Sequence, residues 1–217
     1  MNDFIRARSS EQKEFRMSEI KNAADMLFKK HPFSDITLTT IAENLGWSRA
    51  NLYKYVTTKE EIFLAIVEEK MEIYFSSLYA AFPEKNNFSP EVIAEVWAGI
   101  LNANQEYLRY VSILTSIIEK NVTVKRLVAF KKKYYDFEIS FCIRLSEMLK
   151  ISEKTSAKLF LDILFYASAS ASSCEKNPLI QQALEKINIK TEKSDFSAKL
   201  KDFILMEIMW NTKQQKD

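Results

Sequence analysis

The stretch Thr37–Lys59, TLTTIAENLGWSRANLYKYVTTK, decides the fold of this chain. Thr37 is a favourable N-cap for a first short helix, and Gly46 supplies the left-handed turn that ends it. Ser48 is a favourable N-cap for a second short helix. The apolar positions of both helices recur at helical spacing and are expected to face inward: Leu38, Ile41, Ala42, Leu45, Leu52 and Val56. Two short helices joined by a glycine-containing turn predict a helix-turn-helix.

The second of these helices carries polar and basic residues on its outward side, as a helix that reads DNA does. We expect Arg49 and Asn51, at its exposed start, to touch base edges, because arginine binds guanine and asparagine binds adenine through paired hydrogen bonds. A reading helix of about seven residues spans only about 10 Å and contacts few base pairs. We therefore expect a two-fold dimer that reads a palindromic operator.

The same stretch resembles the DNA-reading motif of tetracycline-repressor (TetR) family regulators. Residues 15–75 take part in the resemblance, which departs from the family at Trp47, where a small aliphatic residue is usual. It implies an all-α, homodimeric, ligand-responsive transcriptional regulator, most often a repressor. The residues that carry it are Thr37, Ile41, Ala42, Leu45, Gly46, Ser48, Leu52, Tyr53, Tyr55 and Lys59.

The resemblance also implies which side chains hold the DNA backbone. Tyr53, Tyr55 and Lys59 are expected to contact phosphates, with Thr37 and Ser48 helping through hydroxyls or capped amides. The complete set of candidate DNA-binding residues is Thr37, Thr39, Trp47, Ser48, Arg49, Ala50, Asn51, Tyr53, Lys54, Tyr55 and Lys59.

Composition predicts an all-α fold for the whole chain. The 217 residues include only two Gly and four Pro, which argues against a β-rich fold, and the net charge is +2. We expect a helix-turn-helix domain over residues 1–57 and a helical regulatory domain for ligand binding and dimerisation over 58–217. Periodicity and breaker residues place helices at about 59–81, 90–103, 105–120, 124–149, 153–174, 178–187 and 195–212.

The central helices are rich in aromatic residues. Each one singly is more often a core residue, but collectively they could line an apolar ligand pocket. Arg144 and Asp162 are isolated charges in apolar surroundings, which could orient a ligand, pair with each other or face water. The candidate pocket residues are Trp97, Tyr110, Phe130, Tyr134, Phe137, Phe141, Arg144, Asp162, Phe165 and Tyr166.

Small residues at 167–173 would let another helix approach closely, and the last helix has apolar positions on more than one face. In TetR-like proteins two C-terminal helices pair with their copies in a four-helix interface, whereas an ordinary intrachain core is the alternative here. The candidate interface residues are Ala167, Ala171, Leu200, Phe203, Met206 and Trp210.

The sequence offers no assembled catalytic pattern. It holds one His, two Cys distant from each other and no glycine-rich phosphate loop, so we expect no enzyme, cofactor or metal site. It has no run of about 20 uncharged apolar residues and no signal-peptide pattern at its start, so we expect a cytoplasmic protein without a membrane partner.

The sequence therefore predicts a regulator that binds double-stranded operator DNA as a homodimer and responds to a small, largely apolar effector. Two other classes stay open: a helical ligand-binding or interaction protein with a vestigial helix-turn-helix, and an all-α enzyme without a recognisable motif. Salt-sensitive retention of duplex DNA separates the first class from the second, and turnover would be needed to support the third.

Overall fold

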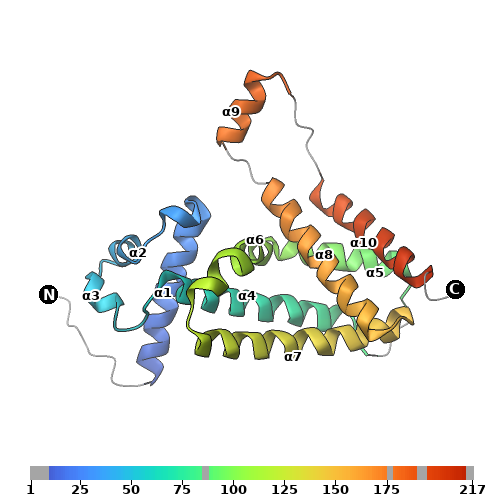
Figure 1. Ribbon diagram of the computed structural model, residues 1–217, viewed down its shortest axis with the longest axis horizontal. Coiled ribbons are helices and arrows are strands. Elements are labelled where there is room, and N and C mark those ends of the chain that lie inside the picture. Colours follow the sequence, from blue (N-terminus) through green and yellow to red (C-terminus); the bar gives the residue numbers. More distant parts are fainter. Residues whose placement is uncertain (1–9, 85–87, 175–177, 190–194, 214–217) are drawn as a thin grey trace. The chain divides into compact units, whose positions relative to one another are not determined.

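The computed structural model describes residues 10–84, 88–174, 178–189 and 195–213, and over these residues it is all-helical, as predicted (Figure 1). The helices are α1 Ser10–Lys30, η1 Phe33–Asp35, α2 Leu38–Asn44, α3 Arg49–Leu52, α4 Lys59–Ala81, α5 Pro90–Ala103, α6 Gln105–Ile113, η2 Leu114–Ile118, η3 Glu119–Asn121, α7 Val124–Leu149, α8 Glu153–Cys174, α9 Pro178–Lys186 and α10 Phe196–Lys213.

The chain divides into two compact units. The first unit contains the residues up to 69 together with 114–130, and the second contains 70–113 and 131–217. Helix α4 runs through the boundary at 69/70 without a break. The domain division after residue 57 that we expected from the sequence stays a prediction.

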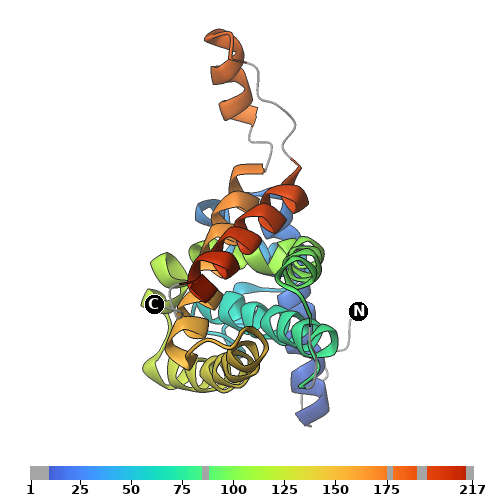
Figure 2. The same ribbon diagram turned by 90° about the vertical axis from the view of Figure 1, so that its right-hand side faces the viewer.

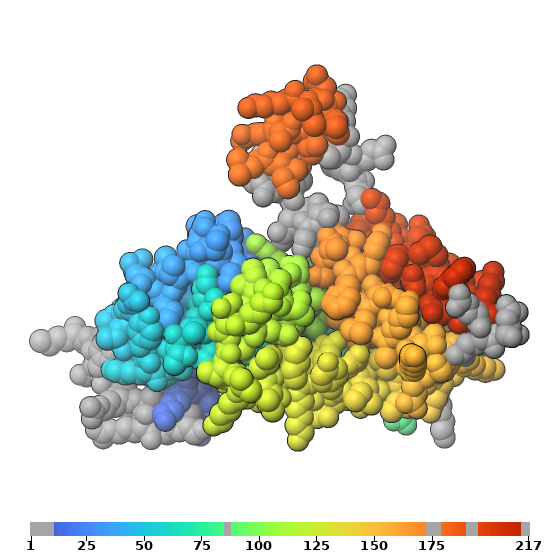
Figure 3. Space-filling view, viewed as in Figure 1, coloured from blue at the N-terminus to red at the C-terminus, as the bar shows by residue number. Residues whose placement is uncertain are grey.

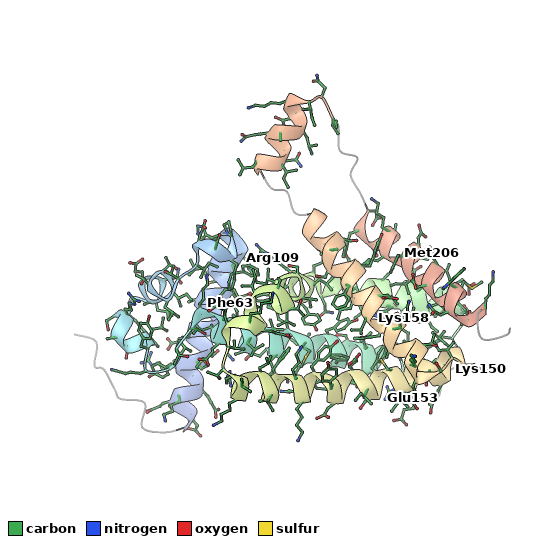
Figure 4. All side chains as sticks on the ribbon, in the orientation of Figure 1. Phe63, Arg109, Lys150, Glu153, Lys158 and Met206 are labelled. Atoms are coloured by element: carbon green, nitrogen blue, oxygen red, sulfur yellow. The ribbon has the colours of Figure 1, made fainter. Side chains whose placement is uncertain are left out.

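The first unit has an apolar core around the inward face of α1. Ile20, Ala23, Ala24 and Phe28 are buried, as their spacing predicts. The ring of Phe63 lies 5.4 Å from that of Phe28 and 4.8 Å from that of Phe33 (Figure 4). These edge-to-face contacts join α1, η1 and α4.

Two side chains that we expected to be buried are exposed. Phe15 is 63% exposed, because it lies more than a turn before the first buried residue of α1. Ile73 on α4 is 61% exposed, because the buried stripe passes through the flanking residues Met71, Tyr74 and Phe75. Neither residue belongs to the core.

The second unit is built around fully buried aromatic side chains. The indole Nε1 of Trp97 donates a 3.0 Å hydrogen bond to the hydroxyl of Tyr74, and both residues are 0% exposed. The ring of Phe160 lies 6.1 Å from that of Trp97 and 5.8 Å from that of Phe141. Helix α10 packs against α5 and α8, and α8 also packs against α6 (Figure 2).

Most helix boundaries fall within one residue of those expected from the sequence. The exception is the helix expected over 105–120, where α6 ends at Ile113 and the chain continues as the π-helix η2 and the 3-10 helix η3. Helix α7 ends at Leu149, after which Lys150 adopts a left-handed φ of 55°. None of the described helices is long and apolar enough to cross a membrane.

Candidate nucleic-acid interface

Local capping fixes both helices of the motif. The backbone N–H of Thr40 donates to the Thr37 hydroxyl at 3.1 Å, and the Thr37 N–H donates to the Thr40 hydroxyl at 2.9 Å. The Ser48 hydroxyl accepts from the Asn51 N–H at 3.2 Å. Gly46, with φ of +66°, makes the left-handed turn between the helices. The predicted helix-turn-helix is therefore present, with α2 and α3 as its helices.

Arg49 and Tyr53 form a pre-arranged pair on the outer side of α3. The Nη2 of Arg49 donates to the Tyr53 hydroxyl at 2.9 Å, and the guanidinium carbon lies 5.3 Å from the centre of the Tyr53 ring. Both residues are exposed. This arrangement holds an arginine fork toward solvent with few rotamers left to lose on binding.

Asn51 does not have the orientation that we expected. It is only 8% exposed, because its position in the short α3 helix turns it toward the same buried side as Leu52. Its Oδ1 lies 3.5 Å from Nζ of the exposed Lys54. The assignment of Asn51 as an exposed residue is wrong, and Arg49 is left as the outward-facing side chain best suited to read a base.

Lys59 is engaged inside the protein. Its Nζ donates to the carbonyl oxygens of Phe33 and Ile36, each at 2.7 Å, and lies 4.1 Å from the centre of the Phe33 ring. Burial lowers the pKa of Lys59, while Glu60 and Asp35 act in the opposite direction. Two of its three N–H donors are thus used within the first unit, a role that the phosphate contact expected from the sequence does not include.

Trp47 packs within the motif. Its ring lies 5.8 Å from that of Tyr55, and the guanidinium of Arg16 lies 5.3 Å from the Trp47 ring centre. Arg16 on α1 was not among the residues expected to matter, and no local pattern in the sequence connects it to Trp47. Of the other candidates, Thr37, Ser48, Ala50 and Lys54 are exposed, and Thr39 and Tyr55 are half-buried.

The residues expected to line a ligand pocket fall into several places. Trp97, Tyr110 and Phe141 are buried in the second unit, Tyr134, Phe137 and Tyr166 are half-buried there, and Phe165 is 53% exposed. Phe130 is buried and belongs to the first unit. The sequence-based list omitted Tyr74, Tyr107 and Phe160, whose rings contact these buried aromatics.

Neither isolated charge lies in the aromatic core. Arg144 donates to the carbonyl oxygen of Phe82 at 2.7 Å and lies 3.6 Å from a carboxylate oxygen of Glu84, so it caps the end of α4. Asp162 accepts a 2.6 Å hydrogen bond from Lys158, one turn earlier on α8. Of the alternatives that the sequence left open, Arg144 and Asp162 neither pair with each other nor stand unoccupied.

The candidate dimer residues divide into buried and exposed groups. Ala167, Ala171 and Leu200 are buried within the protomer, where α8 packs on α6 and α10 packs on α5. Close packing of the small residues is therefore intrachain, and these three are not available as an exposed interface. The ring of Phe203 stacks on that of Tyr166 at 3.7 Å, whereas Met206 and Trp210 are 56% and 61% exposed.

The capped helix-turn-helix and its outward Arg49–Tyr53 pair define a DNA-binding protein of the helix-turn-helix class. Two family models match the chain: "Bacterial regulatory proteins, tetR family" over residues 20–66, and "Tetracyclin repressor-like, C-terminal domain" over residues 68–209. The chain belongs to the TetR family of transcriptional regulators, which are not enzymes.

Known proteins agree with this membership. The uncharacterized HTH-type transcriptional regulator YfiR of Bacillus subtilis (strain 168) is 34% identical over 64 residues, which cover 30% of this chain and 31% of YfiR. The fatty acid degradation regulator FadR from Bacillus halodurans has a similar fold, with a TM-score of 0.57 and 13% identity over 89% of this chain and 94% of that one. The Thermus thermophilus FadR repressor, solved with lauroyl-CoA, gives 0.56 and 16% over 89% and 93%.

Proposed function

We propose that the protein is a repressor that binds a palindromic operator as a homodimer and is released by a small, largely apolar ligand. The observation that carries the proposal is the Arg49–Tyr53 pair, exposed on the second helix of the motif and joined by a 2.9 Å hydrogen bond. One short helix reads few base pairs, so two copies related by a two-fold axis supply the remaining specificity.

Exposed apolar side chains on α8 and α10 support the dimer. Phe165, Met206, Met209 and Trp210 are 53%, 56%, 39% and 61% exposed. The two helices lie side by side on the surface of the second unit, in orange and red in Figure 3. Contiguous exposed apolar side chains are typical of protein interfaces.

The aromatic interior of the second unit supports an apolar effector, because aromatic side chains are the usual lining of ligand sites. The Thermus thermophilus FadR, which shares this fold, is a repressor that binds lauroyl-CoA, a ligand with a long apolar chain. Release requires the ligand to bind one dimer geometry more tightly than the other. If it weakens DNA binding about 100-fold, DNA weakens ligand binding by the same factor, about 2.7 kcal/mol.

Selection of DNA by the purified full-length protein tests the proposal. Retained duplexes from a random pool should share an inverted repeat whose half-sites lie about one helical turn apart, and retention should fall steeply with salt. Thermal-shift screening of apolar and aromatic compounds, followed by DNA-release assays, then tests the effector. Retention without any shared sequence would instead favour a helical ligand-binding or interaction protein with a vestigial motif.

A further inference from the structure

Glu138, in the middle of α7, is the least expected side chain of the second unit. It is 6% exposed, and its carboxylate makes no hydrogen bond or ion pair with any residue that the structure describes. Buried carboxylates are almost always paired, because an isolated buried charge costs several kcal/mol (about 2–7 even for neutral polar groups). A buried carboxylate without a partner therefore indicates a group kept for a ligand.

The neighbours of Glu138 are aromatic or weakly polar. Tyr134 and Cys142 lie one turn before and one turn after it on the same face of α7. Burial raises the pKa of the Cys142 thiol to about 12, and the nearby Glu138 charge raises it further. Burial likewise raises the pKa of Tyr134, with further contributions from Tyr107, Glu138, Tyr74 and Cys142. These polar atoms therefore lie within electrostatic range of one another in a medium of low polarity.

The aromatic rings continue from this cluster into the core. The ring of Tyr74 stacks on that of Tyr107 at 5.3 Å, and its hydroxyl accepts from Trp97. Burial also raises the pKa of Glu138 itself, and Lys131, which acts in the opposite direction, does not offset it. The carboxyl thus stands at the edge of an aromatic shell whose own polar groups do not neutralise it.

We propose that Glu138 is the polar anchor of the effector site and that the site takes an organic amine with an apolar or aromatic body. The inference rests on the repressor function proposed above and names the chemical class of its ligand. An ammonium group donates hydrogen bonds to the carboxylate and is attracted by the faces of aromatic rings. A carboxylate or phosphate head is repelled by Glu138, and a neutral alcohol gains only one ordinary hydrogen bond.

Arg144 and Asp162 do not provide such an anchor. The guanidinium of Arg144 is held by the carbonyl oxygens at the end of α4, and the carboxylate of Asp162 is held by Lys158. Glu138 is the buried charged side chain among the described residues of the second unit, apart from the polar but uncharged Ser146, Ser156, Ser168 and Asn211. The charge selectivity of the site is therefore expected to depend on this one group.

Three compounds with one skeleton test the proposal: 4-phenylbutylamine, 4-phenylbutanol and 4-phenylbutyrate. Binding to the full-length protein is measured by calorimetry at neutral pH. The amine should bind at least about ten times more tightly than the alcohol, and the butyrate more weakly than either. The Glu138→Gln variant, which keeps the shape of the side chain, should lose the preference for the amine, whereas Glu147→Gln, at an exposed position on the same helix, should keep it.

The parent protein alone can overturn the proposal, so it does not depend on how the variant folds. Equal binding of the three compounds, or a preference for the butyrate, contradicts it, as does an amine preference that Glu138→Gln retains. DNA release is measured separately on the same samples. An amine that binds through Glu138 without releasing DNA supports the site and contradicts release by ligand, whereas release by a compound that is indifferent to Glu138 supports the function and contradicts the site.

Discussion

The ammonium group of Lys59 lies 2.7 Å from the carbonyl oxygen of Phe33, so the first residue of α4 is tied to the segment that precedes the helix-turn-helix. The same group reaches Ile36 at 2.7 Å. Together these bonds fasten both ends of the Phe33–Ile36 segment to α4. The placement of α2, which begins two residues later, depends on this attachment.

Lys59 is therefore predicted to position the motif rather than to supply a phosphate contact. Lys59→Met keeps the apolar stem but removes the donors, and it should lower the free energy of unfolding by about 1–2 kcal/mol and weaken DNA binding. The slope of log affinity against log salt should stay that of the parent. Lys54→Met, at an exposed position on the motif, should instead reduce that slope by about 1 without loss of stability. A reduced slope for Lys59→Met would show that its charge contacts DNA.

The Arg49–Tyr53 pair makes a prediction about specificity. Arg49→Ala should cost about 1–3 kcal/mol of operator binding and relax the preference at one base position. Tyr53→Phe keeps the ring but removes the hydroxyl that accepts from Arg49, so it should cost about 0.5–1.5 kcal/mol. Binding is measured against the selected site and against single-base variants of it. If Arg49→Ala binds the selected site as well as the parent does, the assignment of Arg49 is wrong.

The two glycines of the chain should respond to alanine in opposite directions. Gly46 has φ of +66°, so Gly46→Ala should cost about 1–2 kcal/mol of stability from backbone strain alone, since no atom lies within 4 Å of an added Cβ. Gly99, inside α5, also has open space at Cβ and has no positive φ, so Gly99→Ala should stabilise by about 0.5–1 kcal/mol. Denaturant unfolding measures both, and equal signs would contradict the argument.

Dimerisation can be tested at the exposed positions of α10. Met206→Glu and Trp210→Glu should produce monomers in sedimentation equilibrium without loss of helicity, because both side chains are more than half exposed in the protomer. Operator binding should be lost with the dimer. Ile139→Glu is the matched control, since Ile139 on α7 is 55% exposed but lies outside the proposed interface. Monomers that still protect a complete palindrome would contradict the prediction.

Glu138 should make stability depend on pH. Because burial raises its pKa in the folded state, the folded protein binds this proton more tightly than the unfolded chain does. Its ionisation therefore destabilises the fold, and stability should fall as pH rises above the ordinary glutamate value of 4.5. The Glu138→Gln variant lacks this loss, so its stability relative to the parent should increase between pH 5 and 8. A difference that does not change with pH would mean that Glu138 keeps one protonation state over this range.

The sequence predicted the features that depend on local chemistry. Thr37, Gly46 and Ser48 act on backbone groups within three or four residues, so the motif could be located without knowledge of the remaining fold. Helix boundaries were accessible for the same reason. The π-helical turn at Leu114–Ile118 was not, because no short pattern distinguishes it from a continuing α-helix.

Side-chain environments set by distant residues could not be predicted. The partners of Lys59, Phe33 and Ile36, are 26 and 23 positions away, and the partner of Arg144, Phe82, is 62 positions away. Ala167 was assigned to a dimer interface because a small residue suits any close helix contact, and sequence alone does not say which helix approaches. Glu138 went unnoticed because one carboxylate among the lysines of α7 is an ordinary pattern for an exposed helix face.

The first unit is assembled from two separate pieces of the chain, and this limits how it can be cut out or exchanged. Within it, Thr58 donates to the carbonyl of Asn121 at 3.4 Å, and Leu114 and Ile118 are buried. A fragment that stops at residue 69 lacks the whole of 114–130. Grafting only the N-terminal residues onto another regulatory region would transfer the reading helix without part of its support, so chimeric regulators built from this chain should also carry residues 114–130.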